Sequence, residues 1–155
     1  MNPPSNRPGS EIEISDAAWF DLRDLYLLEK ACFGKDAWPI WDIVGVLTLP
    51  NILRLKAEVN QKMVGFIGAD LRYSQHHAWI VTFGVLPAYQ RQGIGTALLE
   101  TCEDMIPLPK IKLSVRRSNH PALQLYRKFG YQEVEIWPDY YQNNEDALVL
   151  KKDTA

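Results

Sequence analysis

The sequence predicts a single α/β domain in which a mixed, mostly antiparallel sheet of about six to seven strands is flanked by four helices. Segments that alternate polar and apolar residues, as half-buried strands do, are interleaved with segments of helical periodicity. The 155 residues suit one hydrophobic core, and they contain neither a linker nor an internal repeat. The predicted order is a strand, two helices, three strands that look antiparallel, a helix, a strand, a helix and two strands.

The first elements follow a tail. Residues 1–10 hold three prolines and no apolar periodicity, so we expect a flexible N-terminal tail before a domain spanning residues 11–152. Alternation over residues 11–14 predicts a strand. Ser15 or Asp16 is a suitable N-cap for the following helix. The apolar residues of that helix are Ala18, Leu22, Leu25 and Leu28.

A second helix and three strands come next. The helix is expected from about Trp41 to Leu49, because Pro50 closes it. Residues 53–59 and 63–72 are rich in strand formers, and their junction at Asn60-Gln61-Lys62 predicts a hairpin. Residues 79–85 form a third strand-like run.

The last third of the chain alternates helices with strands. An apolar face over residues 93–105 predicts a helix, and strict alternation over residues 110–116 predicts a strand. Residues 121–129 form a further helix that ends at a glycine. Residues 131–137 and 146–151 are expected to close the sheet.

Composition excludes several classes of protein. A net charge of −2 and the small basic pair Arg116-Arg117 argue against a nucleic-acid partner. No apolar run reaches about 18 residues, so we expect no membrane association. Two cysteines, Cys32 and Cys102, are too few for a disulfide framework, and without a secretion signal they indicate a cytoplasmic protein. Cys102 is expected in the core. The three histidines lack ligand spacing, so no metal is predicted.

The sharpest motif is a glycine-containing loop that leads from a strand into a helix. It reads Gln90-Arg91-Gln92-Gly93-Ile94-Gly95-Thr96 and follows Val85-Leu86-Pro87. The first N–H groups of a helix lack intrahelical partners, so this loop can cradle a phosphate. The alternative is an ordinary helix start with a tight turn. Thr96 without a preceding lysine excludes a Walker loop, and Leu98 replaces the third glycine of a dinucleotide fingerprint.

A second motif begins where the next strand ends. It runs from Ser118-Asn119 through Tyr126 to Gly130-Tyr131. Ser118 or Asn119 could serve only as an N-cap, and Tyr126 could serve only as an aromatic beside the core.

Together, the two motifs resemble those of the GCN5-related N-acetyltransferases, over Ile12 to Lys151 and most densely from Val81 to Gly130. In that family the first loop grips the pyrophosphate of coenzyme A, the asparagine contacts the cofactor and the tyrosine lies near its sulfur. The resemblance implies acetyl-CoA as co-substrate. The implied cofactor-binding residues are Phe83, Gly84, Val85, Gln90, Arg91, Gln92, Gly93, Ile94, Gly95, Thr96, Asn119 and Tyr126.

The C-terminal segment looks like part of a peptide slot. The stretch from Trp137 to Ala147 is similar to the tyrosine-tyrosine hairpin of protein N-terminal acetyltransferases, including the ribosomal-protein alanine acetyltransferases. Adjacent tyrosines on a strand point oppositely, so at most one of them is expected to face substrate. The alternative is simple aromatic packing. The implied substrate-binding residues are Phe33, Trp38, Ser114, Tyr140 and Tyr141.

The resemblance implies direct attack of an amine on the thioester. A backbone N–H of Phe83–Val85 would stabilise the oxyanion, and Tyr126 would protonate the leaving thiolate. The general base is missing, because Ser114 and Trp79 stand where relatives carry glutamate, histidine or tyrosine. Ser114 could hold a water for a relay. The candidate ends of that relay are His76, His77, Glu133 and Asp139.

The first hypothesis is an acetyltransferase for the α-amine of a protein or peptide, expected as a monomer or weak homodimer. The tyrosine pair favours it. A small-amine acetyltransferase is the alternative within the class, favoured by Ser114. A binding module that senses acetyl-CoA without turnover is the alternative outside the class, although Tyr126 argues against it.

Overall fold

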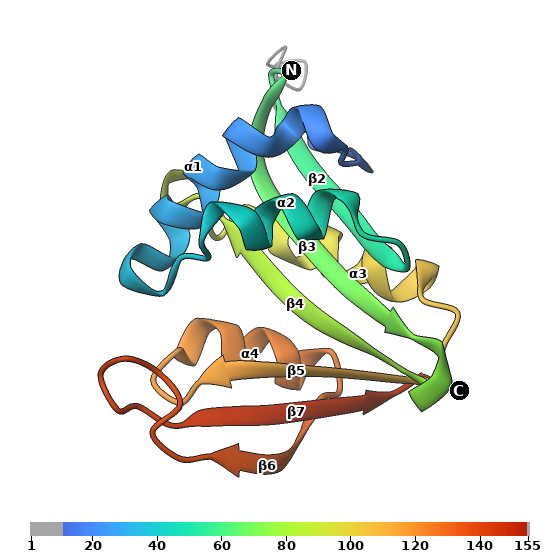
Figure 1. Ribbon diagram of the computed structural model, residues 1–155, viewed down its shortest axis with the longest axis vertical. Coiled ribbons are helices and arrows are strands. Elements are labelled where there is room, and N and C mark those ends of the chain that lie inside the picture. The colour runs from blue at the N-terminus through green and yellow to red at the C-terminus, as the bar shows by residue number, and fades with distance from the viewer. Residues whose placement is uncertain (1–10, 155) are drawn as a thin grey trace, which may run out of the picture.

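The computed structural model describes residues 11–154, so the predicted tail at residues 1–10 lies outside the described part. Seven strands form one sheet in the order β1-β2-β3-β4-β5-β7-β6, and four α-helices flank it (Figure 1). This confirms the predicted fold class and element order. The strands are β1 Glu13–Asp16, β2 Ile52–Val59, β3 Lys62–Arg72, β4 His77–Val85, β5 Lys110–Arg116, β6 Gln132–Trp137 and β7 Ala147–Asp153. The helices are α1 Leu22–Phe33, α2 Ile40–Thr48, α3 Ile94–Met105 and α4 His120–Lys128.

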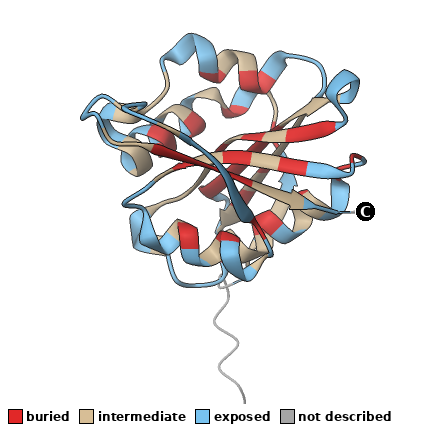
Figure 2. Cartoon of the chain, turned by 90° about the horizontal axis from the view of Figure 1, so that it is seen from below, coloured by how far each residue is buried: buried red, intermediate tan, exposed pale blue. Residues whose placement is uncertain are grey.

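The helices cover both faces of the sheet, and each face has its own core. Leu98 and Cys102 of α3 pack with Leu123 of α4 against one face. Leu28 of α1 packs with Ile43 of α2 against the other. Buried residues accordingly lie along the strands and the inward sides of the helices (Figure 2).

The strands β4 and β5 determine where a ligand can enter the sheet. Within residues 11–154 they are the one parallel pair, and they pair only from Ala78 opposite Ile111 to Ile80 opposite Leu113. Between β3 and β4 the register shifts, so that Gly68 pairs with Thr82 while the next residue pairs with Ile80. Val81 is therefore an extra residue on β4, and such a bulge bends a strand. Beyond the bulge β4 separates from β5, and the two halves of the sheet diverge (Figure 1).

The predicted cap of the first helix is wrong. Ser15 and Asp16 belong to β1, where Asp16 pairs with Leu55 of β2. A short 3₁₀ turn, Trp19–Asp21, precedes α1 instead. Asp21 accepts a hydrogen bond from the backbone N–H of Ala18 at 2.9 Å, so the capping carboxylate comes from within the turn. Hydrogen bonding to β2 keeps Ser15 and Asp16 in the strand, although their side chains are of the kind that usually caps a helix.

Candidate active site

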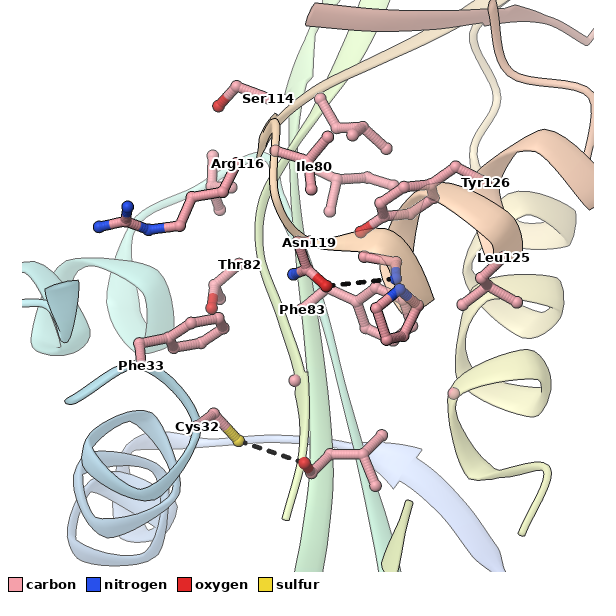
Figure 3. Close-up of a pocket in the computed structure, with 18 of the residues that line it drawn as sticks. Cys32, Phe33, Ile80, Thr82, Phe83, Ser114, Arg116, Asn119, Leu125 and Tyr126 are labelled. Atoms are coloured by element: carbon pink, nitrogen blue, oxygen red, sulfur yellow. Dashed lines mark hydrogen bonds between the residues drawn. The ribbon is translucent and has the colours of Figure 1, made fainter. Parts of the chain in front are cut away.

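A cavity of about 660 Å³ occupies the gap between β4 and β5. Its walls come from α1, β4, β5, α4, the loop that leads into α3, and the loop between β6 and β7. In Figure 3, α3 and α4 with Tyr126 and Leu125 lie on one side of β4, and α1 with Phe33 and Cys32 lies on the other. The cavity thus has two halves, which we call the α3/α4 half and the α1 half, and they meet at the sheet gap.

The loop into α3 has the geometry of an anion cradle. Gly93 is the N-cap residue at φ 84°, a left-handed conformation that glycine adopts without strain. The first intrahelical bond runs from Ala97 N–H to Gly93 O at 3.0 Å, which leaves the three preceding N–H groups of the helix, those of residues 94–96, without intrahelical acceptors. A Cβ at Gly93 would have no heavy atom within 4 Å. The loop therefore leaves room for a phosphate beside several donors, as a coenzyme A diphosphate requires.

The predicted cofactor residues line this cavity, with two exceptions. The side chain of Ile94 is 1% exposed and packs in the larger core. The side-chain amide of Gln92 donates to the Ala88 carbonyl at 3.5 Å. Neither side chain faces the cavity, so of these two residues only the backbone is available to a ligand.

The edge of β4 that faces the gap between β4 and β5 carries backbone N–H groups outside the strand pairing. Leu86 N–H bonds Val64 O on β3 at 2.8 Å. Because backbone N–H groups alternate sides along a strand, those of Phe83 and Val85 point away from β3 and toward the gap. The pairing of β4 with β5 ends before them. These two N–H groups are therefore available for the role at the oxyanion that the sequence predicts.

Asn119 and Tyr126 project from α4. Asn119 is the N-cap, and its Oδ1 accepts from Ala122 N–H at 3.3 Å. The hydroxyl of Tyr126 points into the cavity (Figure 3), while its ring packs 6.2 Å from that of Phe83. Burial, followed by the proximity of Tyr141, raises the pKa of Tyr126 above its ordinary value. The hydroxyl therefore keeps its proton at neutral pH, as a proton donor must.

All five predicted substrate residues line the cavity, namely Phe33, Trp38, Ser114, Tyr140 and Tyr141. The expectation that the two tyrosines sit on a strand is wrong, so the alternation that would let at most one of them face substrate does not apply here. Both lie in the loop between β6 and β7, where Tyr141 N–H bonds Glu145 O at 3.1 Å. Loop backbone does not impose the alternation of a strand, so both rings reach the cavity.

A row of aromatic rings supports this loop. Trp79 of β4 stacks on Trp137 of β6 with ring centres 5.7 Å apart. Trp137 contacts Tyr140 at 5.2 Å, and Tyr140 contacts Tyr141 at 5.0 Å. Trp79 therefore supports the tyrosine pair through Trp137.

Arg116 links the two loops at the cavity mouth, a role that the sequence did not indicate. Its guanidinium donates to Asp36 at 2.7 Å in the 3₁₀ turn Gly34–Asp36, and to Glu145 at 2.8 Å in the loop between β6 and β7. It also lies 4.2 Å from the ring centre of Tyr141. Hydrogen bonds from Ser118 and then Arg116 lower the pKa of Glu145 to about 2.

The predicted relay residues lie elsewhere. None of His76, His77, Glu133 and Asp139 lines the cavity. Sequence reasoning missed Glu29 and Thr82, which do line it. The sequence carried a signal for Glu29, since it follows Leu25 by four residues and Leu22 by seven, which places a carboxylate on the apolar stripe of α1.

The two cysteines of the described residues are free thiols in buried or half-buried surroundings. Cys102 is fully buried in the larger core, which confirms the prediction for it. Cys32 lines the cavity and donates from Sγ to Val85 O at 3.4 Å. Burial, followed by the charge of Glu29, raises the pKa of Cys32 to about 11, so its thiol keeps its proton at neutral pH.

The described residues were also compared with the requirements of a membrane span and of a metal site. Within residues 11–154, no helix is both long and apolar enough to span a membrane. Over the same residues, no three His, Cys, Asp or Glu side chains gather as metal ligands would.

Comparison with known proteins defines the class to which this fold and cavity belong. The model of the acetyltransferase (GNAT) family matches residues 19–131, so the chain belongs to that family and is an N-acetyltransferase. The chain is 36% identical to N-alpha-acetyltransferase 50 of Danio rerio over 149 residues, which cover 91% of this chain and 88% of the relative.

Solved structures of other acetyltransferases share the fold over most of this chain. The chain is similar to the ribosomal-protein-S18-alanine N-acetyltransferase of Escherichia coli, with a TM-score of 0.85 and 28% identity over 92% of this chain and 94% of the other. It is also similar to Naa50 of Arabidopsis thaliana in complex with the bisubstrate analogue CoA-Ac-MVNAL, with a TM-score of 0.81 and 25% identity over 92% and 99% of the two chains.

Proposed function

We propose that the protein transfers the acetyl group of acetyl-CoA to the N-terminal α-amine of a protein or peptide. The continuity of the cavity carries this proposal. A phosphate cradle in the α3/α4 half joins, through the sheet gap, an α1 half walled by aromatic side chains from two loops. The bisubstrate analogue bound to the plant relative joins coenzyme A to a peptide, which supports the same use of the two halves here.

Each half has a defined task. Bound acetyl-CoA supplies the thioester that is attacked. The N–H groups at the start of α3 and the side chain of Arg91 bind its diphosphate. The N–H groups of Phe83 and Val85 stabilise negative charge on the carbonyl oxygen. Tyr126 donates a proton to the departing sulfur. The rings of Phe33 and Tyr141 flank the acceptor.

A small amine is the second candidate acceptor. Ser114 favours it, because the β5 wall of the α1 half offers a hydroxyl beside Tyr141 and no carboxylate. The linkage of the two loops by Arg116 also narrows the mouth through which a peptide would enter.

The test is release of the coenzyme A thiol with matched acceptors. The peptides MVNAL and AVNAL would be offered with free and with acetylated N-termini, beside a peptide whose only amine is a lysine side chain and a set of small amines. The proposal predicts turnover with the free N-termini and none with their acetylated twins. Turnover with small amines alone would show that the second candidate is correct.

A further inference from the structure

The α1 half contains a buried carboxyl group that the fold does not fully satisfy. Glu29 on α1 is 2% exposed and lines the cavity. Its Oε1 accepts a hydrogen bond from the Thr82 hydroxyl of β4, whereas its Oε2 has no partner of hydrogen-bond geometry and only the backbone N–H of Trp38 acts on the carboxyl besides. A buried oxygen without a hydrogen bond of good geometry is unfavourable to folding, so an apolar residue at this position would suit packing better.

The position of Glu29 relates it to the reacting atoms. Thr82 immediately precedes Phe83, whose N–H points into the sheet gap, so the Glu29–Thr82 pair lies beside the place where the thioester carbonyl is expected. Figure 3 shows Thr82 facing the side of α1 and Phe33, opposite Tyr126. Glu29 is therefore on the side from which the acceptor enters.

We infer that Glu29 receives the ammonium group of the acceptor on its carboxylate and takes the proton that the nitrogen must lose before attack. This assignment rests on the proposed function. It also supplies the base that Ser114 and Trp79 cannot provide. An α-amine with a pKa of about 8 is mostly charged at neutral pH, so it needs such a partner.

The protons and electrons balance. The ammonium gives one proton to Glu29, and the nitrogen lone pair then forms the C–N bond while the C–S bond breaks with its electron pair on sulfur. Tyr126 gives its proton to the sulfur, and the nitrogen then loses a second proton, which restores the Tyr126 hydroxyl. Glu29 afterwards releases its proton to water.

The electrostatic surroundings of Glu29 fit a proton acceptor. Burial raises its pKa above the ordinary value, and the Thr82 hydroxyl and the Trp38 amide oppose that shift only in part. A carboxylate with a raised pKa holds a transferred proton better than an exposed one.

The deciding comparison is between Glu29→Gln and the parent protein. Glutamine keeps the size and can still accept from Thr82, so folding should persist, as a melting curve would check. Calorimetry with coenzyme A present would measure MVNAL with a free and with an acetylated N-terminus. We expect the parent to prefer the free form by about tenfold or more, and Glu29→Gln to lose the preference. The kcat/KM for free peptide should fall about 100-fold, with acetyl-CoA affinity within about twofold of the parent.

Two further variants separate this role from a structural one. Glu103→Gln removes a carboxylate that pairs with Lys152 outside the cavity, so it should keep the preference for the free amine. Glu29→Asp retains a carboxylate and should recover part of the lost rate. An unchanged preference, or a Glu29→Gln rate within about threefold of the parent, overturns the assignment.

Failure of the proposed function has a different signature. If the parent protein acetylates small amines but no peptide, the peptide acceptor is wrong. The Glu29→Gln variant is then measured with that amine, and a loss of rate supports the role of Glu29 while an unaltered rate overturns it.

Discussion

Charge at the N-cap of α3 provides a sensitive test of the phosphate cradle. Gly93 has a positive φ of 84°, and a side chain built there would extend into space free of heavy atoms within 4 Å. Asn and Asp adopt this left-handed conformation more readily than other side chains. Gly93→Asn and Gly93→Asp therefore form a matched pair that differs by one negative charge.

The expected size of the difference follows from Coulomb's law. At about 5 Å in water, each phosphate charge repels the new carboxylate by about 0.8 kcal/mol, and a diphosphate carries two such charges. Allowing for salt, the Asp variant should bind acetyl-CoA about 0.8–1.6 kcal/mol more weakly than the Asn variant, or roughly 4- to 15-fold. Folding stability should move the other way, because a carboxylate at a helix N-terminus is favourable by about 0.3–1 kcal/mol.

Isothermal calorimetry with acetyl-CoA at low and at high salt would measure the affinities, and thermal melting would measure the stabilities. The affinity ratio of the two variants should shrink as salt rises. If Gly93→Asp binds within about twofold of Gly93→Asn at low salt, the N-terminus of α3 does not hold the diphosphate.

Three other variants test the remaining parts of the site. Tyr126→Phe should lower kcat about tenfold or more while acetyl-CoA affinity stays within about twofold, since the ring packing is kept; an unchanged kcat would exclude the proton-donor role. Tyr140→Ala should raise the peptide KM several-fold, and an effect on acetyl-CoA alone would place this ring outside the acceptor path. Glu145→Gln tests the link between the loops. Because the pKa of Glu145 is lowered to about 2 from 4.5, its stabilising contribution is complete above pH 4.5 and lost as pH falls toward 2. Chemical denaturation should therefore show a stability difference between the parent and Glu145→Gln that disappears over this range, and a difference independent of pH would contradict the reasoning.

Local periodicity was enough to predict the sheet and the helices, and a local motif was enough to predict the glycine loop that leads into α3. On β5, Ile111, Leu113 and Val115 face the larger core, as their alternation indicates. The hairpin turn also followed from sequence, since Asn60 and Gln61 both take positive φ between β2 and β3. These features depend on residues close together in the chain, so a single sequence contains their signal.

The acceptor wall could not be predicted in the same way. Arg116 bonds to Asp36, which is 80 residues distant in sequence, and no local pattern announces such a pairing. Tyr140 and Tyr141 were expected to alternate as strand residues do, whereas they lie in a loop, and the turn that contains Asn144 at φ 60° separates them from β7. The positions of Arg116 and of the two tyrosines depend on contacts between residues that are distant in the sequence.

A serine at position 114 is compatible with the proposal that Glu29 of α1 is the general base. Ser114 and Arg116 lie two residues apart on the same face of β5, about 7 Å from one another. A carboxylate at Ser114 would lie near that guanidinium, which favours the charged form and so weakens a base. Glu29 is held instead by α1 across the cavity, where burial favours the protonated form. Arg116 is then free to join the two loops while a separate carboxylate takes the proton from the acceptor.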